Sequence, residues 1–89
     1  MTRPGTDKPC TRDDLDVNEV PDGLIVYDIE KDRVHYLNAT AAVVFCTCTG
    51  EFDEAGIAAQ VQEAFGLEQP PLTETAECIA TFADQGLLV

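Results

Sequence analysis

Residues 24–38 read LIVYDIEKDRVHYLN, and this stretch decides the fold. Two short runs rich in β-branched and aromatic residues, 24–28 and 33–37, flank the polar turn 29–32. This is the pattern of a β-hairpin. Asn38 follows at once, and asparagine is a favoured N-cap of helices. The stretch therefore predicts a hairpin that leads directly into a helical half of the chain.

A further strand is expected before the hairpin. The segment 15–20 carries apolar residues and ends at Pro21-Asp22-Gly23, a turn signal in which glycine supplies a positive φ. The run 24–28 is apolar on both of its alternating faces, which suits a central strand. If the first strand pairs with this central strand, the strand at 33–37 keeps a free outer edge.

Three helices are expected after the hairpin. Each has a polar residue before it and a glycine after it, the usual capping pattern. The first is ambiguous by propensity because it mixes valines and threonines with alanines, and its caps favour a buried helix. The apolar stripes are expected to include Phe65 and Ala83, and Leu87-Leu88-Val89 to fold back as a hydrophobic tail. The expected helices span 38–50, 53–66 and 73–86.

The charge is distributed unevenly along the 89 residues, which suffice for one domain. The formal net charge is −12, all five basic residues precede Val34, and every charged residue after it is a carboxylate. Because phosphate binding relies on Lys and Arg, this argues against nucleic acid and favours a basic peptide or protein surface. No apolar run is long enough to span a bilayer, and no secretory signal begins the chain. We therefore expect a cytoplasmic protein without a membrane partner.

The four cysteines are Cys10, Cys46, Cys48 and Cys78. In the cytoplasm we expect reduced, buried, structural thiols. Cys46 and Cys48 would point about 200° apart on a helix and could not grip one metal ion easily. His35 is the one histidine, and the chain contains no serine to pair with it. We expect no metal site, no cofactor and no catalytic residue.

Residues 1–14 contain prolines, a glycine and mixed charges without apolar periodicity. We expect them to form a flexible N-terminal tail. The predicted domain spans residues 15–89.

Several segments together resemble the PqqD-like family. Its members are the peptide chaperones, or precursor-peptide recognition elements, of ribosomally made and modified peptides. The resemblance covers about residues 15–89, and its most specific piece is the strand end YLN with the Ala/Thr run after it. Phe45 departs from the pattern, since many relatives carry Trp at or beside this place. The matching segments are DGLIVYD (22–28), YLNATAA (36–42), IA (57–58), AFG (64–66) and GLL (86–88).

The resemblance implies a winged helix-turn-helix-like fold, with a three-stranded antiparallel sheet followed by three helices. It also implies a non-catalytic function. The leader of a precursor peptide would lie between the third strand and the third helix, extend the sheet by one strand, and be presented to a modifying enzyme. That partner would be a radical-SAM protein or a leader peptidase. The implied peptide-binding residues are Val34, His35, Tyr36 and Leu37 on the strand, and Cys78, Ile79, Thr81, Phe82 and Gln85 on the helix.

Other interpretations stay open. The carboxylates of Glu74, Glu77 and Asp84 are either a solvated helix face or a rim that attracts basic leader residues. The leading alternative is a winged-helix DNA-binding regulator, which would need basic residues on its recognition helix. A homodimer that pairs free strand edges or swaps a strand is also open.

Overall fold

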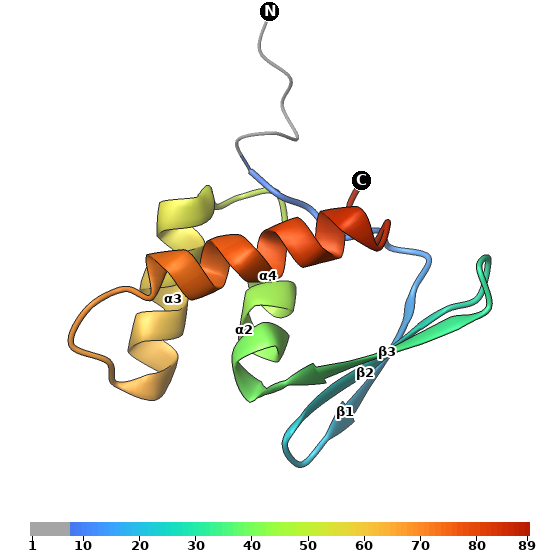
Figure 1. The fold of residues 1–89 in the computed structure, drawn as a ribbon, viewed down its shortest axis with the longest axis horizontal. Coiled ribbons are helices and arrows are strands. Elements are labelled where there is room, and N and C mark those ends of the chain that lie inside the picture. The colour runs from blue at the N-terminus through green and yellow to red at the C-terminus, as the bar shows by residue number, and fades with distance from the viewer. Residues whose placement is uncertain (1–7) are drawn as a thin grey trace, which may run out of the picture.

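The computed structural model describes residues 8–89, which form three antiparallel strands followed by three helices (Figure 1). This order confirms the predicted α+β fold class. The strands are β1 (Asp16–Val20), β2 (Gly23–Asp28) and β3 (Arg33–Asn38). The helices are α2 (Ala39–Thr47), α3 (Glu54–Phe65) and α4 (Leu72–Asp84).

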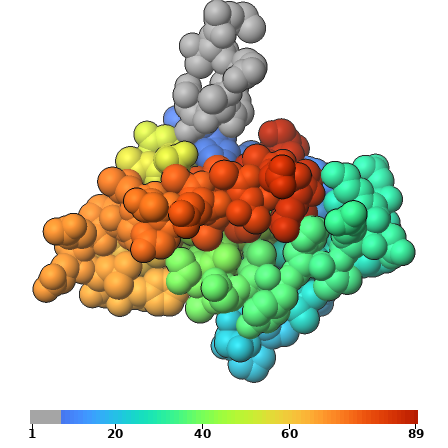
Figure 2. All heavy atoms as spheres, viewed as in Figure 1, coloured from blue at the N-terminus to red at the C-terminus, as the bar shows by residue number. Residues whose placement is uncertain are grey.

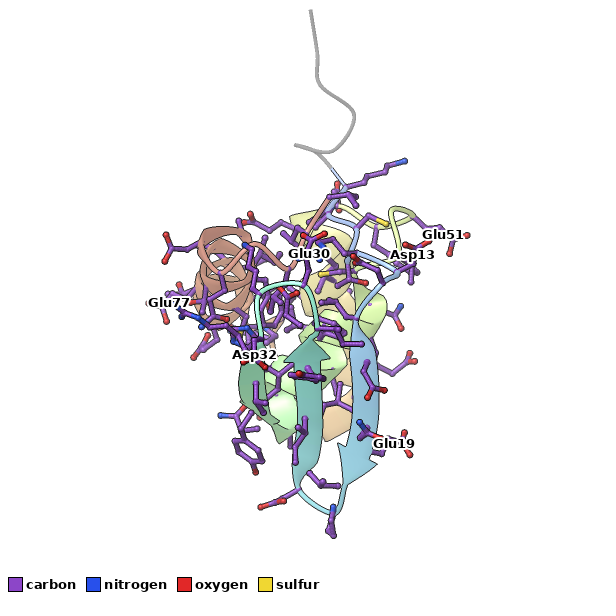
Figure 3. The ribbon with its side chains drawn as sticks, turned by 90° about the vertical axis from the view of Figure 1, so that its right-hand side faces the viewer. Asp13, Glu19, Glu30, Asp32, Glu51 and Glu77 are labelled. Atoms are coloured by element: carbon purple, nitrogen blue, oxygen red, sulfur yellow. The ribbon has the colours of Figure 1, made fainter. Side chains whose placement is uncertain are left out.

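The sheet has the order β1-β2-β3, so β2 is the central strand as expected. Side chains alternate between its two faces, and Leu24, Val26 and Leu37 are buried on the face that packs against the helices. On the other face, Ile25 pairs with Tyr36. Figure 3 looks onto this second face, which none of the three helices covers.

The caps of α2 and α3 follow the sequence prediction. Asn38 Oδ1 accepts a hydrogen bond from the backbone N–H of Ala41 at 2.9 Å. Asp53 Oδ1 accepts one from Gly56 at 2.8 Å, and Gly66 ends α3 with a φ of 64°. The helical span of α2 nevertheless stops at Thr47, before the expected end.

Three details of the helices differ from the prediction. α4 begins at Leu72 after Pro71, which has no side-chain cap, so Thr73 lies inside the first turn. Phe65 is 42% exposed and Ala83 is exposed, although both were expected on inward stripes. Phe65 lies at the end of α3, four residues after Val61, the last buried residue of that helix. Ala83 follows the buried Phe82, and one step along a helix turns its side chain by about 100° away from the core.

The core lies between the sheet and the three helices. Phe45 of α2 and Phe82 of α4 meet edge to face, with ring centroids 5.6 Å apart, an arrangement that aromatic pairs prefer. Ile57 and Leu87 are fully buried in the same cluster, so the C-terminal residues do fold back onto the domain.

The cysteines do not share one environment. Cys48 is 1% exposed in the core, Cys10 and Cys78 are half-buried, and Cys46 is exposed. The expectation of buried thiols is therefore wrong for Cys46. Cys46 lies in the last turn of α2, two positions before the buried Cys48. Two steps along a helix turn a side chain by about 200°, so Cys46 faces away from the core.

The segment before β1 is packed onto the domain. The backbone N–H of Arg12 donates to the carbonyl of Leu87 at 2.9 Å, and that of Val89 donates to Cys10 at 2.9 Å. Residues 8–14 of the predicted flexible tail thus contain a strand-like strap, whereas residues 1–7 lie outside the described residues. Pairing between chain ends is a long-range contact, and local composition cannot reveal it. None of the helices within residues 8–89 is long and apolar enough to cross a membrane.

Candidate functional site

β3 forms one edge of the sheet. Within residues 8–89 its ladder partner is β2 alone. Every second residue of an antiparallel edge strand directs its N–H and C=O away from the partner strand. The strap before β1 pairs with Thr49 and Leu88 instead of with this edge. In the part of the chain that the structure describes, no strand occupies the outer edge of β3.

A groove of about 670 Å³ runs between β3 and α4. Figure 2 shows α4, in orange to red, lying along the green atoms of β3 and α2. β3 and α4 run in opposite directions (Figure 1), and His35 of β3 shares a second hollow with Asp84 and Gln85 at the end of α4. The deepest side chains of the groove are Leu37, 6% exposed, and Phe82, 1% exposed. The lining consists of Val34, His35, Tyr36, Leu37, Asn38, Thr40, Ala41, Glu74, Glu77, Cys78, Thr81, Phe82 and Gln85.

The structure brings eight of the nine predicted peptide-binding residues together on this groove. Ile79 is the exception. It is half-buried and packs against the hydrophobic core, because a step of one residue along a helix turns a side chain by about 100° away from Cys78.

The four strand residues contribute to the groove in two ways. His35 pairs with Val26 and Leu37 pairs with Leu24, so both lie on the helix-facing side of the sheet. Val34 and Tyr36 lie on the opposite side and are 65% and 57% exposed. They border the groove along the edge of β3, and their side chains lie on the face of the sheet that the helices do not cover.

Sequence reasoning missed Thr40 and Ala41, which also line the groove. Both lie in the first turn of α2, immediately after β3. The sequence did contain a signal for these two residues. Asn38 caps α2 and also ends β3, so the first turn of α2 must lie beside the end of β3.

The groove thiol is a weak nucleophile. Burial raises the pKa of Cys78, and the nearby carboxylates of Glu77 and Glu74 raise it further. Little thiolate therefore forms near neutral pH, and the thiolate is the reactive form. Among residues 8–89, no group of three or more His, Cys, Asp or Glu side chains is placed to hold a metal ion.

A buried ion pair fixes the end of α4 against the sheet. Arg12 Nη1 donates to Asp28 Oδ2 at 3.0 Å and to the carbonyl of Gly86 at 2.9 Å. It thereby joins the strap, the end of β2 and Gly86, which lies two residues after the end of α4. Sequence reasoning missed this pair, although Asp28 shares the buried register of Leu24 and Val26, where a charge requires a partner.

The arrangement can bind an extended backbone: an open strand edge supplies hydrogen-bonding groups, and an apolar floor lies beside it. No protein-family model, no curated protein and no solved structure matches the chain.

Proposed function

We propose that this chain is a non-catalytic module that captures the leader of a ribosomally made precursor peptide by β-strand addition. The observation that carries the proposal is the open edge of β3 beside the groove against α4. An extended peptide adds a strand to such an edge through main-chain hydrogen bonds, and adjacent pockets select its side chains. The sequence resemblance to the PqqD-like family, with its winged helix-turn-helix-like fold, points the same way.

Edge hydrogen bonds cannot supply the whole affinity. Each contributes about 0.5–1.5 kcal/mol net, whereas micromolar binding needs about −8 kcal/mol after the leader has been ordered. Apolar leader side chains must therefore fill the groove over Leu37 and Phe82. The bound leader would then be presented to a modifying enzyme in the cytoplasm, either a radical-SAM protein or a leader peptidase.

A winged-helix DNA-binding role is supported less well. Recognition helices and their flanks contact phosphates through Lys and Arg, and α2, α3 and α4 contain neither residue. A gel-shift assay at physiological salt separates the two functions. Sequence-specific retardation of duplex DNA by this chain would reverse our preference.

The test of the proposed function is calorimetry with synthetic leader peptides from precursor genes next to this one. We expect a Kd of about 10 µM or lower for one of them. If none of the neighbouring leaders binds, the proposal fails.

Proline substitutions test whether the β3 edge is the binding element. Val34 and Leu37 lie three positions apart, so one directs its N–H outward and the other directs it toward β2. Proline removes that N–H. Of Val34→Pro and Leu37→Pro, we expect the outward-facing variant to stay folded by circular dichroism and lose leader binding. We expect the other to lose stability as well. Val17→Pro on the opposite edge strand is the matched control and should keep binding.

A further inference from the structure

The two ends of the groove differ in charge. Glu74 and Glu77 line the groove from the first half of α4, away from the end marked by Gln85, and in Figure 3 Glu77 projects from α4 on the β3 side of the sheet. Past the other end, a second hollow of about 640 Å³ adjoins the groove, because His35 and Gln85 line both. This second hollow is lined by Lys31, Arg33, His35, Asp84 and Gln85.

The cations of the second hollow are not neutralised by ion pairs. Within residues 8–89, every contact shorter than 4.0 Å between a basic nitrogen and a carboxylate belongs to Arg12. Lys31 and Arg33 have no carboxylate that close, although the chain has 17 acidic residues and a net charge of −12. Asp84 lines the same hollow and offsets one of the two positive charges of Lys31 and Arg33. The lining of the hollow is still less negative than the part of the groove that is lined by Glu74 and Glu77.

We infer that the groove selects an extended peptide with opposite charges at its two ends. A Lys or Arg of the peptide lies by Glu74 and Glu77, and an Asp or Glu lies by Lys31 and Arg33. Short apolar side chains lie between them, over Leu37. This inference rests on the proposed function and adds the class of peptide that the groove takes.

The length of β3 sets the spacing of the two charges. From Arg33 to Asn38 the strand rises about 17 Å at about 3.3 Å per residue. Only every second side chain of a guest strand faces α4. The charged residues of the guest should therefore lie an even number of positions apart, about four or six.

The probe is an acetylated and amidated seven-residue peptide, Lys-Thr-Val-Thr-Val-Thr-Glu, whose charges share one face with the valines. Its comparison peptides have the reversed order, Glu-Thr-Val-Thr-Val-Thr-Lys, or glutamine at both ends. Titrations of the ¹⁵N-labelled full chain by NMR give a Kd from the amide shifts of β3 and α4. We expect one of the two charged orders to bind about five times more tightly than the glutamine peptide.

Variants of the protein test whether the tighter binding of the charged peptide depends on Glu74, Glu77, Lys31 and Arg33. Glu74→Gln with Glu77→Gln, or Lys31→Gln with Arg33→Gln, should bring the Kd of the preferred charged peptide closer to the Kd of the glutamine peptide, because each pair removes the charges that meet one end of the guest. Glu54→Gln with Glu63→Gln on α3 alters the net charge as the first pair does and should keep the preference.

The outcomes separate this inference from the proposed function. Equal binding of all three peptides at β3 and α4 overturns the charge selection and leaves strand capture standing. If none of the peptides shifts the β3 and α4 amides, and neighbouring leaders also fail in calorimetry, strand capture itself fails. A preference that survives both groove double variants overturns the assignment to these charges.

Discussion

Asp28 is a buried charge that helps to hold the sheet and α4 together. Its side chain has no exposed surface. Arg12 donates to it at 3.0 Å, and the backbone N–H of Lys31 donates to it at 3.3 Å. Burial raises the pKa of Asp28, but these hydrogen bonds and the attraction of both positive charges outweigh burial and hold the pKa below its ordinary value of 3.8. The carboxylate is therefore ionised in the folded protein throughout the physiological range.

We expect this pair to make the folding stability depend on acid pH. The folded-state pKa of Asp28 is lower than the unfolded one, so its stabilisation is present above about pH 4 and is lost as the pH falls through the folded value. Urea unfolding should show that Asp28→Asn is less stable than the wild type at neutral pH, and that the difference narrows below about pH 4. Asp13→Asn, at an exposed position, is the control. A difference that stays constant down to about pH 2 would contradict this account.

Cys78 offers a direct report on groove occupancy. It lines the groove and is half-buried, whereas Cys46 is exposed and lies outside the groove. We expect a saturating leader peptide to slow alkylation of Cys78 by iodoacetamide about tenfold or more, since a bound strand covers the thiol, and to leave Cys46 unchanged. Mass spectrometry after cleavage at glutamates measures both rates, because Glu51, Glu54 and Glu63 separate the two thiols, whereas the chain has no Lys or Arg after Arg33. Equal protection of the two thiols would place the peptide elsewhere.

At the scale of elements, α4 has to serve the core and the groove at once. Phe82 packs edge to face on Phe45 and also lines the groove. Thr75 lies on the buried side of the same helix with no exposed surface, and its hydroxyl has no hydrogen-bond partner within residues 8–89. A buried hydroxyl without a partner destabilises a fold. α4 therefore carries a local defect close to its first turn.

We expect Thr75→Val to stabilise the protein. Valine has nearly the same shape as threonine and removes the unsatisfied hydroxyl, so the free energy of unfolding should rise by about 1 kcal/mol. Thr73→Val, at an exposed position in the same turn, should change it by less than about 0.5 kcal/mol. Urea denaturation of the three proteins measures the differences. A loss of stability in Thr75→Val beyond that of the control would mean that the hydroxyl is satisfied in solution.

At the scale of the whole molecule, the sheet has helices on one face, and the net charge is −12. Four of the five basic residues lie within residues 8–89. They fall in the strap, in the turn before β3 and at the first residue of β3, and none of these four lies in a helix. A charge this far from zero opposes the compact state by self-repulsion.

We therefore expect added salt to stabilise the domain. Sodium chloride at about 0.15 M reduces the Debye length to about 8 Å and screens the carboxylates from one another. The Tm measured by calorimetry should rise by several degrees between about 0.01 M and about 0.15 M salt. Sucrose at the same osmolality controls for general solvent effects. A falling Tm would mean that the attraction between Arg12 and its carboxylates outweighs the repulsion.

Much of the fold was readable from residues close together in the chain. Alternation in residues 24–28 identified the central strand, and the Asn38 and Asp53 caps located two helix starts. The end of α2, the start of α4 and the exposure of Phe65 were not readable in this way. They depend on where neighbouring elements lie, and periodicity carries no information about that.

The sequence by itself determined the order of strands and helices, because alternation and capping are local properties. That β3 is an edge strand followed from the sequence only if β1 paired with β2, and the structure confirms this pairing. The sequence also determined the acidic surface of the helical half. The tertiary structure alone decided that α4 lines a groove with β3, that Arg12 holds Asp28, and that the strap pairs with Leu88. Each of these joins residues far apart in sequence, and such contacts are set by packing and by the pairing of buried charges in three dimensions.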